Sequence, residues 1–142
     1  MSYSMLVPRR AGRQRMAIRA AVMIANLMCK LKPARLERLM RLASRRTRAI
    51  DTELLEQLYD EICRVDPRVA GWRGCLPRSI AICLLCRWEG AWPDGWRSGI
   101  HRAPPFSAHA WIENEGRIVR QNNVPDDYRP LLTADGQRTS AA

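Results

Sequence analysis

Cys75 has the residue type and the local setting of a catalytic nucleophile. It directly precedes a predicted helix, which begins at Leu76 or Pro77 because proline is preferred in the first helical turn. Backbone amides and the helix dipole at such a position stabilise a thiolate, which is the reactive form of cysteine. Arg78, on the first turn of the same helix, would add to this effect. The sequence therefore predicts an activated thiol at Cys75.

His109 is the residue that could serve as the base for this thiol. It lies in an alternating segment, 106–113, which predicts a strand and places His109 on one face with Trp111 and Glu113. The other histidine, His101, lies in a predicted exposed loop. An imidazole on a strand beside the helix terminus could take the proton of the thiol. The pattern predicts a cysteine–histidine pair made from Cys75 and His109.

The remaining four cysteines are predicted to pack in the core. Cys83 and Cys86 suggest a metal or redox pair, but structural zinc usually needs two such pairs on turns, and this one lies within a predicted helix. Free cysteine is among the most buried residue types, so we expect core packing here and at Cys29 and Cys63. No metal or cofactor is predicted. An odd number of cysteines and the lack of a secretion signal predict a reducing, cytoplasmic location.

The order of predicted elements indicates an α+β fold. Hydrophobic periodicity predicts helices over 12–31, 34–48, 51–65 with Asp51 as N-cap, and from residue 76 or 77 to 90. Short strands are predicted over 96–101, 107–113, 117–121 and 128–133. We expect a basic helical region over 1–70, a catalytic core over 71–134 and a flexible tail over 135–142.

The charge of the chain is unusual. Twenty-four Lys and Arg residues against 14 Asp and Glu residues give a net charge of +10, which favours anionic partners. The most apolar window, 16–29, is too short to span a bilayer. One alternative to an enzyme is therefore a non-catalytic basic adaptor that binds nucleic acid or a peptide. No recognised nucleic-acid-binding motif accompanies the basic residues, so we expect no nucleic acid as partner.

Three segments resemble the leader peptidases of lasso-peptide biosynthesis, which are stand-alone transglutaminase-like cysteine proteases. The segments are GCLPRSIA at 74–81, PPFSAHAWIE at 104–113 and YRPLLT at 128–133. The resemblance covers about 71–133, and the basic helical half also looks similar. It implies that the helical half packs on a small, papain-like core of one central helix and an antiparallel sheet.

The resemblance also implies an activity and partners. The family removes the leader from a ribosomally made precursor peptide, so that a partner cyclase can close a macrolactam. Cys75 would attack the scissile carbonyl and His109 would move the proton. We expect the chain to be too short for its own leader-recognition domain, which implies a separate leader-binding protein. Trp72 and Trp111 flank the pair in sequence and are candidates for a substrate groove, although both could instead pack in the core.

The third catalytic residue departs from the family pattern. The family usually carries an acidic residue on the strand after the histidine strand, but here that strand holds Gln121 and Asn122. Either could lie opposite His109, depending on the hairpin register. Asparagine can orient an imidazole, so Asn122 is the preferred candidate. The other candidates are Gln121 and three acidic residues that could reach in from the side: Glu113, Asp126 and Asp127.

Overall fold

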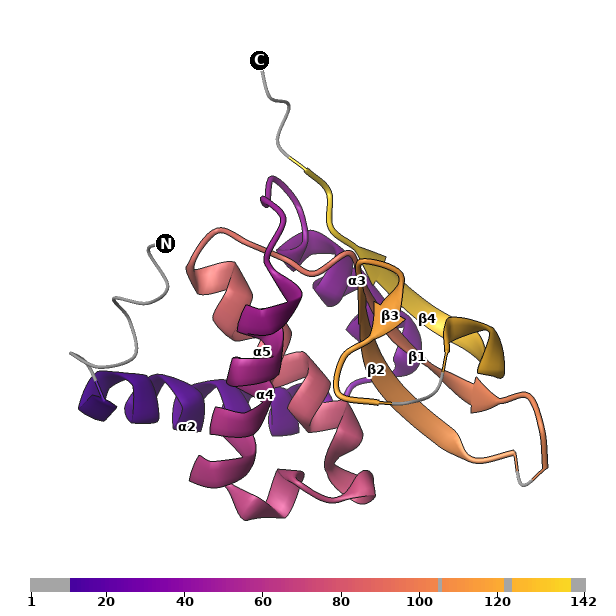
Figure 1. Cartoon of the computed structure of the whole chain (residues 1–142), viewed down its shortest axis with the longest axis horizontal. Coiled ribbons are helices and arrows are strands. Elements are labelled where there is room, and N and C mark those ends of the chain that lie inside the picture. The colour runs from indigo at the N-terminus through magenta and orange to yellow at the C-terminus, as the bar shows by residue number, and fades with distance from the viewer. Residues whose placement is uncertain (1–10, 105, 122–123, 139–142) are drawn as a thin grey trace.

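The computed structural model describes residues 11–104, 106–121 and 124–138. Its helices are α2 (Ala11–Met28), α3 (Pro33–Ala43), α4 (Thr52–Val65) and α5 (Cys75–Trp88), with short 3₁₀ turns η1 (Pro67–Val69), η2 (Trp72–Gly74) and η3 (Pro125–Asp127). Its strands are β1 (Gly95–His101), β2 (Ala108–Asn114), β3 (Arg117–Ile118) and β4 (Tyr128–Asp135). The predicted α+β fold is confirmed: α2, α4 and α5 lie to one side of the sheet, and α3 lies against β4 (Figure 1).

Helices α3 and α4 form because each presents one apolar face. In α4 the buried residues Leu55, Leu58 and Ile62 follow the three-to-four spacing of a helix surface. Asp51 occupies the predicted N-cap position, but its side chain makes no capping hydrogen bond. The loop predicted before Cys75 contains η1 and η2, so the chain approaches α5 in two tight turns.

Helix α5 is buried on nearly all sides and forms the centre of the molecule. It contacts α2 and α4 on one side and β1 and β2 on the other. Cys83 and Cys86 are 0% and 2% exposed, which confirms that they pack in the core. Burial raises the pKa of both thiols, that of Cys86 to about 12. Cys29 and Cys63 are only partly buried.

The sheet is antiparallel with strand order β3-β2-β1-β4. Its inner face places Trp96 and Ile112 in the same core as the helices, together with Trp92 from the segment before β1. The edge strand β4 is covered by α3: Arg41 donates to the Thr133 carbonyl at 3.0 Å, and Glu37 accepts from the Thr133 N–H at 2.9 Å. Side chains of a helix thus satisfy an edge that would otherwise be open to pairing.

Two local expectations are corrected by the structure. His101 is the last residue of β1, not a loop residue, and its ring lies edge-on to Tyr128 with centroids 5.1 Å apart. The predicted strand 117–121 is only two residues long, because Arg120 adopts a left-handed backbone with φ 59°. A left-handed residue cannot continue a β-ladder, so pairing ends before it.

The segment 135–142, expected to be a flexible tail, is held in place over its described part. Asp135 ends β4, and Gln137 exchanges backbone hydrogen bonds with Ser44 and Thr47, each 3.0 Å long. Residues 139–142 lie outside the described part of the chain.

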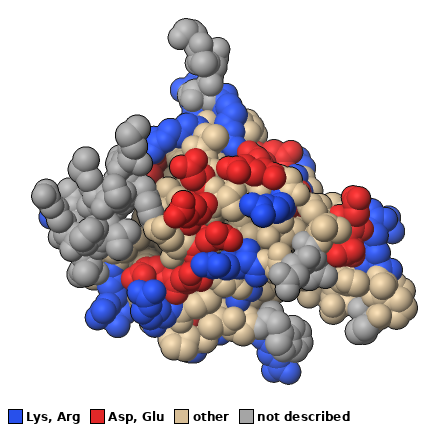
Figure 2. Space-filling view, in the orientation of Figure 1, with Lys and Arg blue, Asp and Glu red and all other residues tan. Residues whose placement is uncertain are grey.

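The charged side chains are unevenly distributed. Figure 2 shows acidic side chains gathered across the middle of one face, where α4 lies. Helix α4 contributes Glu53, Glu56, Asp60 and Glu61 to the acidic residues of the chain. Among the described residues, no helix is both long enough and apolar enough to cross a membrane.

Candidate active site

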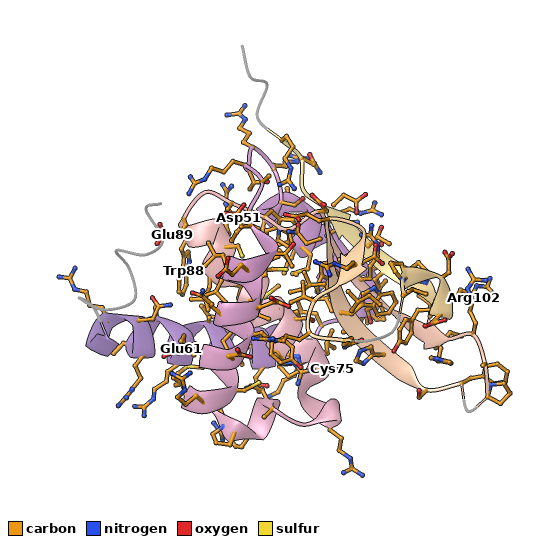
Figure 3. All side chains as sticks on the ribbon, viewed as in Figure 1. Asp51, Glu61, Cys75, Trp88, Glu89 and Arg102 are labelled. Atoms are coloured by element: carbon orange, nitrogen blue, oxygen red, sulfur yellow. The ribbon has the colours of Figure 1, made fainter. Side chains whose placement is uncertain are left out.

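Cys75 is the first residue of α5, one position earlier than the predicted helix start. Gly74 precedes it as the N-cap, and a side chain there would meet the backbone of Val69, with a Cβ only 2.4 Å from the Val69 Cα atom. Glycine is therefore what lets η1 pack directly against the start of α5. The N–H of Cys75 lies in the first helical turn, where backbone donors have no acceptor within the helix. Cys75 itself is 8% exposed and lies in the interior beside the end of the helix (Figure 3).

Arg78 holds the loop that leads into Cys75. Its guanidinium is 4% exposed and donates to the carbonyls of Val69, Ala70 and Gly71, at 2.7, 3.0 and 3.0 Å. The same group lies 4.7 Å from the centre of the Tyr59 ring, in a cation–π contact. Arg78 was expected to act on the thiol. The structure gives it a clear positioning role, because its hydrogen bonds fix the two turns before Cys75.

His109 lies on β2 within an aromatic cluster. Its ring centroid is 6.0 Å from that of Trp111 and 5.4 Å from that of Tyr128, and both rings stack on it. Burial lowers the pKa of His109, the contact with Gln121 raises it, and the positive charge of Arg78 lowers it further. The net direction is downward from 6.5, so the folded chain favours a neutral imidazole, as a general base requires.

Gln121 is the residue that the structure brings to His109. The β2–β3 register pairs Glu113 with Ile118, and a regular ladder would continue until Asn122 lay opposite His109. The left-handed Arg120 ends that ladder, and the side-chain amide of Gln121 reaches the imidazole, with its Nε2 atom 2.6 Å from His109 Nε2. Asn122, the preferred candidate from sequence, lies outside the described residues.

The orientation of the Gln121 amide decides which imidazole nitrogen can act as base. Amide nitrogen and oxygen are assigned from the hydrogen-bond network, and with nitrogen toward His109 the Oε1 atom of Gln121 is buried without a partner. With oxygen toward His109, Oε1 accepts the Nε2–H and leaves Nδ1 free to take a proton. A basic Nδ1 requires the second orientation, in which Gln121 Oε1 is the acceptor.

The three acidic candidates for the third position have other surroundings. Glu113 accepts from the Trp111 indole at 2.8 Å and lies 3.8 Å from Arg97. Asp127 accepts from the backbone N–H of Val124 at 3.1 Å, and Asp126 is exposed. Glu113 is thus engaged on the far side of Trp111. Among the residues that the structure describes, no group of three His, Cys, Asp or Glu side chains could hold a metal ion.

A small cavity between α5 and the sheet reaches Cys75 and the glutamine that contacts His109. Cys75, Arg78, Trp111 and Gln121 line this cavity, and Gln121 contacts His109. Tyr128 gives a second link, because it stacks on His109 and its pKa is raised by burial, by Asp127 and by the charge of Cys75.

The two tryptophans proposed for substrate contact differ in what the structure describes. Trp111 is 2% exposed and forms the wall of this cavity beneath the histidine, so it shapes the site but offers little surface. The side chain of Trp72 lies outside the described part. Sequence reasoning assigned no role to Tyr128, although it begins the third of the quoted segments, nor to Tyr59.

Comparison with known families decides where the chain belongs. A family model described as "Transglutaminase-like superfamily" matches residues 18–133, which includes Cys75, His109 and Gln121. The chain belongs to the transglutaminase-like superfamily. This superfamily commonly contains cysteine proteases, which agrees with a thiol at a helix N-terminus and a histidine on a strand of the sheet that packs on that helix. Comparisons with curated proteins and with solved structures found no match.

The Gln121 contact predicts opposite shifts in two variants. Gln121→Glu should raise the pKa of His109 by about 1 to 3, because a carboxylate beside the ring favours the imidazolium. Gln121→Ala should lower it, because the contact that raises it is lost. Titration of the imidazole C–H signals by NMR measures both shifts, and His101 is the internal control because it contacts Ala103 and Tyr128 instead. If both variants titrate like the wild type, Gln121 does not orient His109.

Proposed function

We propose that this chain is a cysteine peptidase that removes the leader from a ribosomally made lasso-peptide precursor, before a partner cyclase closes the macrolactam. The observation that carries the proposal is the arrangement of Cys75 at the start of α5, around one cavity with the glutamine that orients His109. Membership in the transglutaminase-like superfamily supports the peptidase chemistry. The three segments quoted above, which resemble lasso-peptide leader peptidases, support the choice of substrate.

The proposed reaction runs through a thioester. The Cys75 Sγ atom attacks the scissile carbonyl carbon while His109 Nδ1 takes the thiol proton. The backbone N–H of Cys75 is positioned to donate to the oxyanion, since it has no acceptor within the helix. When the C–N bond breaks, His109 gives the proton to the leaving amine. Water, deprotonated by His109, then attacks the thioester and releases a carboxylic acid and the free thiol.

In this scheme Gln121 takes the place of the acidic residue that the family usually carries. A neutral amide can fix the imidazole orientation through one hydrogen bond, but it does not stabilise the imidazolium by charge. The lowered pKa of His109 agrees with this, because burial disfavours the charged ring and its contact at Nε2 is with an uncharged amide. We therefore propose that the resting pair is a neutral imidazole beside the thiol.

The proposed substrate presentation involves other proteins. A separate leader-binding protein would bring the precursor to Cys75, and Trp72 and Trp111 remain the proposed contacts for the bound peptide. Cys75 is 8% exposed, so the scissile bond must enter a site that the free chain keeps largely closed. A requirement for the leader-binding protein would agree with this burial.

The non-catalytic adaptor explains less of the molecule. It accounts for the net charge of +10, but it assigns no role to a thiol and an amide that line one cavity, or to the imidazole that this amide contacts. An adaptor would need only the basic outer surface, and that surface is separate from the cavity.

The proposal predicts site-specific hydrolysis of a precursor peptide. Purified chain, incubated with a lasso-peptide precursor and its leader-binding protein, should release the intact leader and the intact core, measured by mass spectrometry. An unrelated acidic peptide of the same length should remain uncut. Binding of the precursor without cleavage, with or without the leader-binding protein, would instead support the adaptor.

A further inference from the structure

Helix α2 exposes an apolar stripe on the side that faces away from the core. Met16, Met23 and Leu27 are spaced by seven and four residues, so they lie on one face of the helix. They are 72%, 64% and 59% exposed. The opposite face is buried and packs on α5 and α4 through Ile18, Ala21, Val22 and Ala25. A contiguous row of exposed large apolar side chains commonly marks an interaction surface.

Part of this stripe lines a groove. Met23 and Leu27 form one wall, and residues 65–68, from the last residue of α4 into η1, form the other. The groove has a volume of about 790 Å³, which lies within the usual range of binding pockets. Its lining residues are Arg19, Val22, Met23, Asn26, Leu27, Lys30, Val65, Asp66, Pro67 and Arg68. Methionine is flexible and polarisable, so a Met-lined wall can adapt to an inserted side chain.

The rim of the groove carries net positive charge. Arg19 and Lys30 make no ion pair with any residue that the structure describes. Asp66 is the acidic lining residue, and Arg68 pairs with it at 2.9 Å and lowers its pKa. Arg19 also lowers the pKa of Asp66 through its charge, so this carboxylate faces two arginines. With Lys30 included, the lining keeps a net positive charge for an incoming anionic group.

The surrounding sequence extends this charge. No acidic residue precedes Glu37, whereas eight basic residues do: Arg9, Arg10, Arg13, Arg15, Arg19, Lys30, Lys32 and Arg35. The acidic side chains gather elsewhere, over α4, where Glu61 projects from the helix (Figures 2 and 3). Segregated charge of this kind selects partners of the opposite sign and speeds their association.

We propose that the groove between α2 and residues 65–68 docks an acidic, amphipathic polypeptide segment. Its apolar side chains would cover Met23 and Leu27, and its carboxylates would pair with Arg19 and Lys30. A polypeptide fits better than nucleic acid, because phosphates gain nothing from the apolar wall between the two cations. It fits better than a membrane, because Met23 and Leu27 line a hollow and not a flat face. This docking does not depend on the chemistry of Cys75. The further step, that the segment belongs to the protein presenting the precursor, rests on the proposed function.

A model peptide tests the docking directly. The probe is a fluorescein-labelled peptide with leucine at helical spacing and glutamate at its other positions. Binding to the whole chain is measured by fluorescence anisotropy, and the contact surface is mapped by NMR shifts of backbone amides. We expect the shifts to concentrate on α2 and residues 65–68. A peptide with lysine in place of glutamate should not bind, and one with serine in place of leucine should bind at least about tenfold more weakly.

Matched variants locate the site. Met23→Ser with Leu27→Ser should weaken peptide binding by about tenfold or more. The control is Leu39→Ser with Leu42→Ser on α3, where the side chains are 42% and 47% exposed, and binding should stay unchanged. Arg19→Glu with Lys30→Glu should abolish binding, whereas Arg35→Glu with Arg38→Glu should only weaken it. Melting curves establish that each variant folds.

Three results would overturn the inference. They are shifts mapped away from α2, equal losses in the α3 control, and displacement of the peptide from α2 by a DNA duplex or by vesicles of anionic lipid. The proposed function is judged separately by precursor cleavage. If the chain cleaves the precursor but does not bind the peptide, only the docking proposal is contradicted. If the chain binds the peptide but does not cleave the precursor, only the peptidase proposal is contradicted.

Discussion

Replacing Cys75 by alanine is expected to reduce precursor cleavage by about 10,000-fold or more, since the nucleophile of a covalent mechanism has no substitute. The side chain is small and buried at the start of α5, and alanine keeps its backbone geometry. The fold should therefore survive, and the precursor should still bind. Cleavage is measured by mass spectrometry over time, and folding by the melting curve. His109→Ala should give a loss of similar size, because the two residues act as a unit.

The matched control is Cys63→Ala, since Cys63 is a half-buried thiol on α4 outside the cavity. It should leave cleavage close to the wild-type rate. Limiting iodoacetamide should label Cys75 in preference to Cys83 and Cys86, whose pKa values are raised by burial. His109→Ala should weaken the labelling of Cys75. Wild-type cleavage by Cys75→Ala would show that the nucleophile lies elsewhere.

The parts of the site that follow local rules were predictable from sequence. A cysteine before a helix-starting proline, and a histidine in an alternating strand, give the elements and the faces without any tertiary information. The structure places Cys75 at the start of α5 and His109 on β2 beside Trp111, as those patterns predict. The core positions of Cys83 and Cys86 followed equally well from helical context.

The partner of His109 depended on a feature that sequence does not signal. A left-handed backbone is usually marked by glycine or asparagine, and here it occurs at Arg120. Arg120 also pairs with Asp60 and Glu56 of α4, and such long-range contacts can hold an unfavourable backbone in place. If the hairpin register is counted along a regular strand, His109 therefore pairs with Asn122 and not with Gln121. Tertiary contacts, and not strand parity, bring the amide to the imidazole.

Arg78→Met is expected to lower the free energy of unfolding by about 3 kcal/mol, since it removes the donor for three inward-facing carbonyls. Arginine is rarely buried, so the sequence did not predict that Arg78 would hold the loop before Cys75 in place. Methionine fills much of the same volume, which limits the effect of a cavity. Urea unfolding measures the change, and Arg64→Met is the control. Arg64 is exposed and pairs only with Glu61 among the described residues, so its loss should cost less than about 1 kcal/mol.

The charge of Arg78 has a second, separable effect on His109. That charge lowers the pKa of His109, so Arg78→Met should raise it, whereas Arg78→Lys should keep the charge and leave the pKa closer to the wild-type value. The lowered pKa of His109 also makes the free energy of unfolding depend on pH in a defined direction. A depressed pKa makes no difference to stability above about 6.5, and stability falls as the pH drops from there toward the folded pKa, because the unfolded chain takes up the proton first. In Arg78→Met this acid-side loss should be smaller than in the wild type. An equal loss in both would mean that Arg78 supports the loop before Cys75 and has no electrostatic influence on the base.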